Sequence, residues 1–523
     1  MFFGFSGSLL QLLVTVFLLI VITIGLKYIA IWKYLRLLKA NGALTYFDFP
    51  HGYVKCLQTG EKEGDSFFWI KKMIQTHSKA RLVATHFALT PSIQLIDSDL
   101  IKEFFSHQQK YTKSPMWGIY VTVMGKGLLF SEGLVWKKHR KILSEMFRFD
   151  QIASQLSELS QLCRELIMNE VSRYQTEIDL LGLSRNIAGQ LVFRLFFGRN
   201  GNEANIEGEK ATLYLARFLS TLDENTFSPE SLFFGPSIVF RGILKRNRRL
   251  LSESAKFKHF CLEIIKKSTE EFLAISSSSN SVNKESKCML MKLIASNLQG
   301  SAEEKLTDEE ILHEFITFFL AGMDTTAQWL TMSLYFFSTL PKKDQNVILK
   351  EASKIEGLKA EITHNSLNEC PYLVGLLKET LRVATPAPVF FDRQALEDHY
   401  IGDVIIKKGS VINVSFMANQ FNPNYFKQPE EFNIHRWIPG DLLFEESVSK
   451  NPFIFTPFSA GSRNCIGQHL AMIEVKILLS ILLTNFEVQI PENYKLKMSL
   501  RFVYEPQMTL YANIFPKHEK STH

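Results

Sequence analysis

Cysteine is scarce in this 523-residue chain, and the few cysteines are not spaced as metal ligands or disulfide partners. No CxxC pair or zinc-finger spacing occurs among the six: Cys56, Cys163, Cys261, Cys288, Cys370 and Cys465. This usage is typical of a reducing compartment and argues against a disulfide framework. The net charge is only +6, so composition does not indicate a nucleic-acid-binding protein.

Apolar runs long enough to span a membrane are also lacking, except at the N-terminus. Residues 2–26 contain no charge and are rich in Leu, Ile, Val and Phe. At about 1.5 Å per residue, they can cross a hydrocarbon core of roughly 30 Å. Basic residues follow the run and none precedes it, which predicts a cytoplasmic body: Lys27, Lys33, Arg36 and Lys39. A cleaved signal peptide is the alternative, but it would have a basic start and a shorter apolar core.

No internal repeat divides the rest of the chain. A serine-rich stretch at 276–281 reads as a solvated loop. With 46% hydrophobic and 12% aromatic residues, the sequence predicts a globular, mainly α domain with small β-sheets. We expect β-like segments near 81–96, 400–414 and 508–514. The predicted division is a transmembrane anchor (2–26), a basic linker (27–45), a catalytic domain (46–516) and a polar tail (517–523).

The stretch FSAGSRNCIGQHLA around Cys465 is the most informative part of the sequence. Gly461 and Gly467 flank the cysteine and allow tight turns and close approach of the backbone to a bulky group. A helix-like apolar segment follows, and the free N–H groups at its start favour a thiolate. A thiolate held in this way suits an iron that needs strong electron donation. A buried structural cysteine is the alternative for an isolated residue.

The pattern F-x-x-G-x-R-x-C-x-G resembles the haem-binding loop of the cytochrome P-450 family. The resemblance implies that Cys465 is the proximal ligand of a haem iron, with heme b (iron protoporphyrin IX) as the cofactor. It also implies that Arg463 contacts a haem propionate. The cofactor-binding residues assigned in this loop are Phe458, Gly461, Arg463, Cys465 and Gly467.

A long helix is predicted from Thr307, because Thr307 and Glu310 form a T-x-x-E capping box. No proline interrupts it before Pro341, so the helix is expected to run about 33 residues, roughly 50 Å. Its middle, AGMDTT at 321–326, contains residues that are unfavourable inside a helix. Gly322 alone should cost about 1 kcal/mol of helix stability relative to alanine.

Small residues on one face of this helix would leave room for a flat ligand, with the Thr325 hydroxyl directed toward it. The alternative is that Thr325 bonds the Ala321 carbonyl and bends the helix. The segment resembles the family's oxygen-binding motif. That resemblance implies that Ala321 and Gly322 lie over the haem, that Asp324 relays protons, and that Thr325 places its hydroxyl beside the oxygen.

Three charged residues are expected to be structural. Glu379 and Arg382 form an E-x-x-R pair on one helix face, although such pairs are common by chance. The segment PEEFNIHR, which ends at Arg436, resembles the family's P-x-x-F-x-x-x-R segment. The resemblance implies that Arg436 joins the other two to lock the fold around the haem.

Trp136 and Arg140 lie one helical turn apart in a basic segment. The resemblance implies that the pair reaches a haem propionate. It also implies that the nearby lysines 137, 138 and 141 steer an electron donor. A solvated charged face is the alternative.

The chain departs from the family pattern in places. The proline-rich hinge after the anchor is missing, and Arg393 is not assigned to the haem. A substrate pocket is expected at 115–124, at Phe315, Phe318 and Phe319, and at 387–391. Most of these residues are apolar or aromatic, which favours a lipophilic substrate.

The sequence therefore predicts a haem-thiolate monooxygenase anchored in the endoplasmic reticulum membrane by one span, with its catalytic domain cytoplasmic. It would bind dioxygen, take electrons from NADPH through an NADPH-cytochrome reductase, and insert one oxygen atom into a lipophilic small molecule. One alternative is a reductase-independent isomerase or dehydratase of the same fold. The other is a non-catalytic haem protein that binds ligands. The retained Asp324–Thr325 pair disfavours both.

Overall fold

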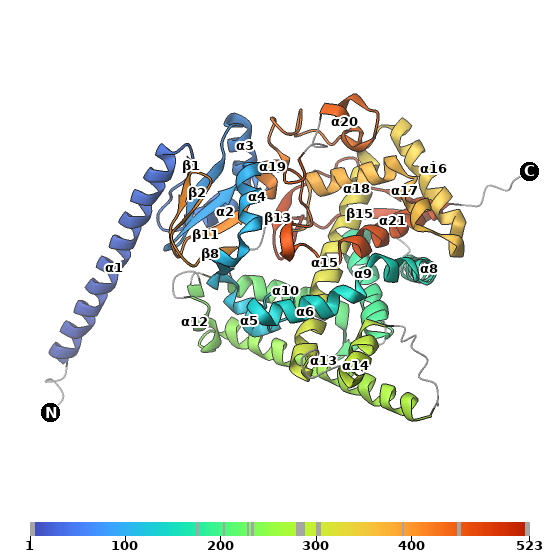
Figure 1. The fold of residues 1–523 in the computed structure, drawn as a ribbon, viewed down its shortest axis with the longest axis horizontal. Helices are drawn as coiled ribbons and strands as arrows, with labels where there is room; N and C mark the ends of the chain where they lie inside the picture. The colour runs from blue at the N-terminus through green and yellow to red at the C-terminus, as the bar shows by residue number, and fades with distance from the viewer. Residues whose placement is uncertain are drawn as a thin grey trace, which may run out of the picture.

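Helices surround several small sheets in the computed structural model of the chain (Figure 1). The structure describes residues 6–173, 177–201, 204–226, 228, 230–231, 235–278, 288–299, 305–389, 392–446 and 451–517. The predicted serine-rich loop and the polar tail lie mostly outside these ranges, as do residues 2–5 of the predicted anchor. The mainly α fold with small sheets is confirmed.

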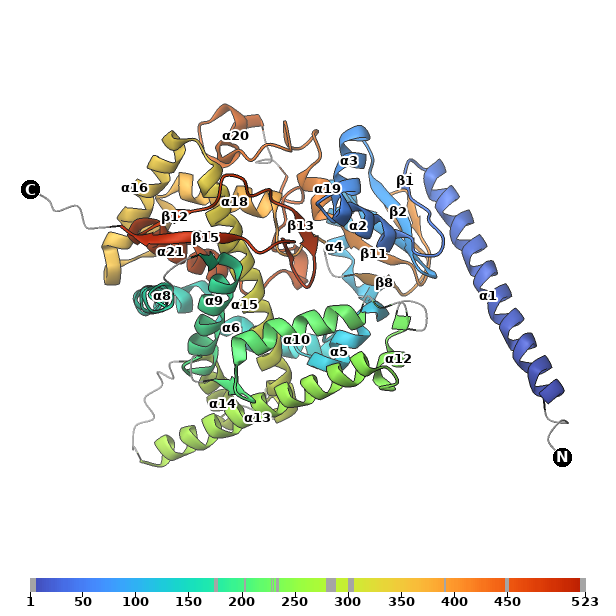
Figure 2. The same cartoon turned by 180° about the vertical axis from the view of Figure 1, so that it is seen from behind.

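One helix, α15 (Asp308–Thr339), runs through the middle of the body (Figure 2). Thr307 caps it as predicted: its hydroxyl accepts from the Glu310 N–H at 3.1 Å, and the Glu310 carboxylate accepts from the Thr307 N–H at 2.8 Å. The helix ends two residues before Pro341. It packs against α9 (Leu180–Phe197), α18 (Pro371–Val383) and α21 (Gln468–Asn485).

The main sheet has six strands in the order β1-β2-β3-β11-β8-β4. These strands are β1 (Leu44–Thr45), β2 (Leu82–Phe87), β3 (Thr90–Leu95), β11 (Val411–Val414), β8 (Arg393–Ala395) and β4 (Tyr111–Lys113). The β1–β2 and β3–β11 pairs are parallel, and the other neighbours are antiparallel. Strands β3 and β4, in the first quarter of the chain, thus pair with strands about 300 residues later in the sequence, which no local pattern reveals.

Smaller sheets and further helices complete the body. The sheets contain β9 (His399–Ile401) with β10 (Val404–Ile406), β13 (Met498–Leu500) with β14 (Tyr504–Pro506), and β12 (Phe486–Gln489) with β15 (Tyr511–Pro516) and β5 (Ile178–Asp179). The helices used below are α5 (Gly118–Met124), α6 (Gly133–Met146), α7 (Phe149–Ala153), α8 (Leu156–Val171), α10 (Ala211–Thr226), α13 (Lys245–Ser278), α14 (Met289–Gln299) and α16 (Lys342–Leu358).

The N-terminal helix α1 (Ser6–Ala40) projects from the body (Figure 1). Its side chains from Leu10 to Leu26 are mostly exposed and apolar. It is the one helix of the described ranges that is long and apolar enough to cross a membrane, with a mean hydropathy of 2.5 in its most apolar window.

The second half of α1 differs from the predicted basic linker, because 27–40 continues the helix and packs on the main sheet. Its buried residues recur at helical spacing: Tyr28, Ile31, Tyr34, Leu35 and Leu38. The Tyr34 hydroxyl donates to the Ile405 carbonyl at 2.9 Å. The four basic residues obscured this amphipathic pattern in the sequence.

Glu379, Arg382 and Arg436 form one buried cluster beside α18. Arg382 Nη2 lies 2.8 Å from Glu379 Oε1, and Arg436 Nε lies 3.3 Å from the same oxygen. Arg382 also donates to backbone carbonyls of the loop that leads to Arg436. Removing one partner would leave an uncompensated buried charge, which costs about 3–5 kcal/mol.

Candidate active site

The loop that carries Cys465 is held by its own backbone. The Cys465 N–H donates to the Phe458 carbonyl at 2.9 Å, and α21 begins at Gln468. Gly461 adopts a φ of +72°, and a Cβ there would lie 3.2 Å from the Phe105 carbonyl oxygen. The turn therefore requires glycine at this position.

The Cys465 side chain is accessible, although the surrounding protein is dense enough to desolvate it. Both observations fit a thiol that faces an internal space. Burial raises the pKa of Cys465, while the Gly467 N–H and the charge of Arg140 lower it to a smaller extent. The N–H at the helix start thus lowers the pKa in the expected direction, but burial outweighs it in the metal-free thiol. A coordinated metal ion would deprotonate it.

Helix α6 brings cations to this loop. Arg140 donates to both the backbone and the side-chain oxygen of Asn464, at 2.8 and 2.7 Å. Arg463 donates to the Ser131 carbonyl at 2.8 Å, and its guanidinium lies 3.8 Å from the centre of the Trp136 ring. The structure thus brings Trp136, Arg140 and Arg463 together beside Cys465.

Two further cations join this group across a strand pair. Lys113 of β4 lies opposite Arg393 of β8 in an antiparallel register. Burial, with the repulsion of Arg393, lowers the pKa of Arg463 to about 9, and burial lowers that of Arg393 to about 10. Burial, together with repulsion from Arg393 and Arg463, holds the pKa of Lys113 well below its ordinary value.

One carboxylate, Glu132, is found among these cations in the described part of the chain. It accepts from the Lys113 N–H at 2.6 Å and lies 3.8 Å from Arg393 Nη1. The group of Arg140, Arg463, Arg393, Lys113 and Glu132, which we call the cation cluster, therefore has an excess of positive charge. It fits a ligand edge that carries more than one negative charge.

Sequence reasoning missed Lys113 and His139. Lys113 gives no local signal, because only the β4–β8 pairing places it here. His139 is fully buried between two carboxylates of α15, with Nδ1 2.6 Å from Glu314 Oε1 and Nε2 3.1 Å from Glu310 Oε1. It fastens α6 to α15 and so fixes the neighbouring Arg140.

On α15, an accessible strip interrupts an otherwise buried helix. Ala321 is exposed and Thr325 is partly exposed, while most of their neighbours are buried. Ala321, Thr325 and Trp329 follow one another at i,i+4 spacing, and the Phe458 ring packs 5.8 Å from that of Trp329. The strip therefore extends from the point where the Cys465 loop touches α15.

Thr325 donates to the Ala321 carbonyl at 2.6 Å, as the alternative interpretation predicted. Gly322 is partly exposed, like Thr325. A Cβ at Gly322 would lie 2.9 Å from Val192 Cγ2 of α9, so the absent side chain allows two helices to approach closely. The expectation that Gly322 lies over the haem stays a prediction.

Asp324 is buried and paired with a cation. Arg185 of α9 places its Nε 2.6 Å from Asp324 Oδ1, and its Nη2 2.6 Å from Glu505 Oε2 of β14. Burial raises the pKa of Glu505 to about 7, and Asp324 adds to the effect. A third acid, Asp223, accepts from the Tyr120 hydroxyl, and burial raises its pKa to about 7.

These four residues, Asp324, Glu505, Asp223 and Arg185, form an anion cluster in which α15, β14, α10 and α9 each contribute one side chain. It has three carboxylates and one buried cation, the opposite balance to the cation cluster. Two of its acids therefore exchange protons near neutral pH.

Two of the predicted pocket residues belong to the core instead. Phe315 stacks on Phe197 with ring centres 3.4 Å apart, and Phe319 is fully buried against Phe193 at 4.8 Å. Both face α9, which sequence spacing alone does not reveal. Two other residues of the predicted pocket, Phe390 and Phe391, lie outside the described ranges.

A family model described as Cytochrome P450 matches residues 57–511, most of the chain. The chain belongs to the cytochrome P450 family. A relative named Probable cytochrome P450 4s3, from Drosophila melanogaster, is 25% identical over 88% of this chain and 90% of its own length. Cytochrome P450 4V2 of Mus musculus is 26% identical over 82% and 81%. The crystal structure of the cytochrome P450DA heme domain covers 91% of this chain and 98% of its own, with a TM-score of 0.70 at 19% identity.

Membership makes this P450 a haem-binding monooxygenase, and the residues of the site fit that group. Cys465 offers an accessible sulfur beside a glycine-formed turn. The cation cluster carries the excess charge that two propionates would balance. Ala321 and Thr325 leave an accessible strip on α15.

Proposed function

We propose that Cys465 ligates the iron of haem b and that the cation cluster binds the two propionates. The excess positive charge beside an accessible cysteine is the observation that carries this proposal. When bound, the haem supplies activation of dioxygen, and the thiolate promotes O–O cleavage. Arg463 and Arg140 hold the anionic edge, while Gly461 and Gly467 shape the turn that presents the sulfur.

The electrons come from NADPH through a partner reductase that binds near α6. Lys137 and Lys141 are exposed there and suit an acidic partner. Lys138 contributes less to this surface, because its ammonium lies 3.2 Å from Glu310 of α15. The exposed apolar side chains of Leu134 and Val135 adjoin these two lysines on the same helix.

Protons reach the reaction through α15. Asp324 is the proton relay, and Arg185 bridges it to Glu505, whose raised pKa of about 7 makes its proton exchangeable near neutrality. Thr325 presents its hydroxyl on the accessible strip, where its bond to Ala321 orients it. Loss of the Asp324 carboxylate or the Thr325 hydroxyl is expected to uncouple NADPH consumption from product formation without preventing haem binding.

The substrate is a lipophilic small molecule, because the strip is approached by apolar and aromatic side chains. Phe318 of α15 and Trp117, beside α5, remain as candidate pocket residues. The first half of α1 anchors the protein as a single span in the endoplasmic reticulum membrane, with the body in the cytoplasm. The basic residues after the apolar run support this orientation.

The reduced, carbon monoxide-bound difference spectrum tests the ligand, with wild type beside Cys465→Ala. We expect the red-shifted Soret band of thiolate-ligated haem in the wild type alone. Turnover with and without a reductase and NADPH then separates a monooxygenase from an isomerase or a ligand-binding protein. A wild-type spectrum without the shift would refute the assignment of Cys465.

A further inference from the structure

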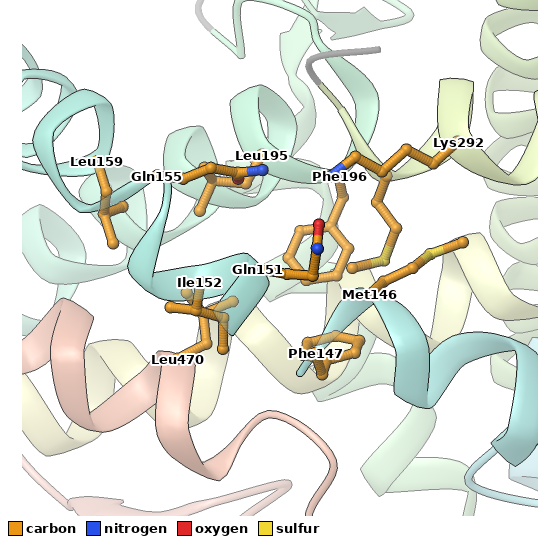
Figure 3. Close-up of a pocket in the computed structure, with 11 residues that line it drawn as sticks. Met146, Phe147, Gln151, Ile152, Gln155, Leu159, Leu195, Phe196, Lys292 and Leu470 are labelled. Carbon is orange, nitrogen blue, oxygen red and sulfur yellow. The ribbon is translucent and has the colours of Figure 1, made fainter. Parts of the chain in front are cut away.

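A small cavity is lined by residues that include neither Cys465 nor any residue of α15 (Figure 3). Its volume is about 50 Å³. The lining residues come from the end of α6 and from α7, α8, α9, α14 and the start of α21. Nothing described so far uses this cavity.

The cavity has a polar rim and an apolar floor. Gln151 is exposed at the rim, and Gln155 and Lys292 are partly exposed. Phe147, Phe196, Ile152 and Leu159 of the lining are buried. An opening at the surface therefore leads to an interior that offers a ligand few hydrogen-bonding groups.

Three aromatic rings connect the floor to α15. Phe147 and Phe196 line the cavity, and both pack on Phe318 of α15, with ring centres 5.4 and 5.2 Å away. Their own rings are 5.9 Å apart, so the three form a closed triangle. Phe318 lies one turn before the accessible Ala321.

The same floor also touches the Cys465 side. Leu470 lines the cavity from the first turn of α21. A Cβ at Gly467 would lie 3.7 Å from Phe147 Cε1. Phe147 thus lines the cavity and also contacts Phe318 of α15 and the segment just after Cys465.

The size and lining of the cavity select its occupant. A dry apolar cavity of about 150 Å³ can bind benzene or xenon. This one is smaller, which excludes a lipophilic substrate, and its floor offers little to an ion or a sugar. A small apolar gas molecule fits both its volume and its chemistry.

We propose that this cavity admits dioxygen to the haem side of α15, and that Phe147, Phe196 and Phe318 form the gate. The proposal rests on the proposed function, which requires dioxygen at that place. Rotation of the Phe147 ring opens a path from the floor to Phe318 and the strip beyond it. The substrate then uses a different approach, so the two reactants do not compete for one channel.

Xenon tests the site directly, because it is a heavy apolar atom that occupies gas cavities. Crystals of the full-length holoprotein under xenon pressure should show xenon among Phe147, Ile152 and Leu470. Leu195→Trp fills the cavity from α9 and should abolish that density. Met289→Trp, from α14, repeats the test if the first variant does not fold. Wild-type crystals without xenon in this cavity would overturn the proposal.

Carbon monoxide rebinding after a light flash tests the connection to the haem. We expect Leu195→Trp to slow bimolecular association several-fold and Phe147→Ala to speed it several-fold. Leu213→Trp is the matched control, because Leu213 is exposed on α10 and does not line the cavity. Equal rates in all variants would overturn the route. The position of the Soret band reports Cys465 ligation separately, so failure of the ligand assignment is distinguishable.

Discussion

The two clusters of the site carry opposite charge. Beside Cys465, four cations accompany one carboxylate, Glu132; around Asp324 of α15, three carboxylates accompany one cation, Arg185. Both are largely buried, so neither imbalance is neutralised by solvent. The difference shows that burial alone does not decide which charge a site holds. The cation cluster suits a permanently anionic ligand edge, whereas the anion cluster suits protons that come and go.

The two clusters also differ in how they are held. Arg140 and Arg463 donate to backbone carbonyls, which cannot change their charge. Arg185 is divided between two carboxylates, and at least one of them titrates near neutrality. The first cluster is therefore fixed in geometry, and the second can redistribute its contacts.

Reversing one charge of the cation cluster should have the largest effect. Arg463→Glu places a second carboxylate beside Glu132 and removes the contact with Trp136. We expect most of the bound haem to be lost, measured as haem per protein after purification. Arg81→Glu is the control, because Arg81 forms an exposed pair with Asp403. Full haem content in Arg463→Glu would show that the cluster does not bind the propionates.

Neutralising Asp324 should leave haem in place but impair its use. Asp324→Asn removes the proton-bearing group, and such groups contribute about 100-fold or more to rate. We expect substrate turnover to fall by about that factor, while NADPH consumption continues and the carbon monoxide spectrum is unchanged. The control Asp308→Asn lies in the exposed first turn of the same helix. Unchanged coupling of NADPH use to product would contradict the proton role.

Glu505→Gln should change the pH dependence of stability. The pKa of Glu505 is raised from 4.5 to about 7, so the folded state binds its proton more tightly than the unfolded state. Stability from this group is present below pH 4.5 and is lost as pH rises toward 7. The wild type should therefore lose up to about 3 kcal/mol across this window relative to the variant.

The measurement is the unfolding temperature of both proteins from pH 4.5 to 8, compared with the exposed-residue control Glu487→Gln. The charges facing Glu505 are Arg185, Asp324, Asp223 and Arg501. Asp223→Asn tests whether Asp223 also contributes to the pH dependence of the unfolding temperature. A constant difference between wild type and Glu505→Gln would show that Glu505 does not titrate in this range.

Gly322→Ala should have the smallest effect. Alanine gains about 1 kcal/mol of helix propensity, while contact with Val192 costs about 1–3 kcal/mol. We expect a slight loss of stability that Val192→Ala relieves in the double variant, with an unaltered haem spectrum. A shifted spectrum would instead place Gly322 against the haem.

Sequence predicted those features that depend on consecutive residues. The Cys465 turn, the Thr307 cap and the Glu379–Arg382 pair are each contained within a short segment, so the residues of each feature can be recognised from the sequence. Lys113 and Arg393 meet only because β4 pairs with β8. Likewise, Arg185 of α9 reaches Asp324 of α15 and Glu505 of β14. Such contacts depend on the packing of distant segments. The directions of Phe315 and Phe319 were missed for a related reason, since a helical repeat gives a face but not the helix that covers it.

The continuity of α1 has a mechanical consequence. The apolar half and the half that packs on the main sheet belong to one helix, without a hinge between them (Figure 1). With its apolar half in a bilayer, the helix acts as a lever. Bilayer thickness changes the tilt of a span, and here any change of tilt would turn the sheet and the body attached to it. The lipid would thereby set the angle at which the catalytic body faces its partners.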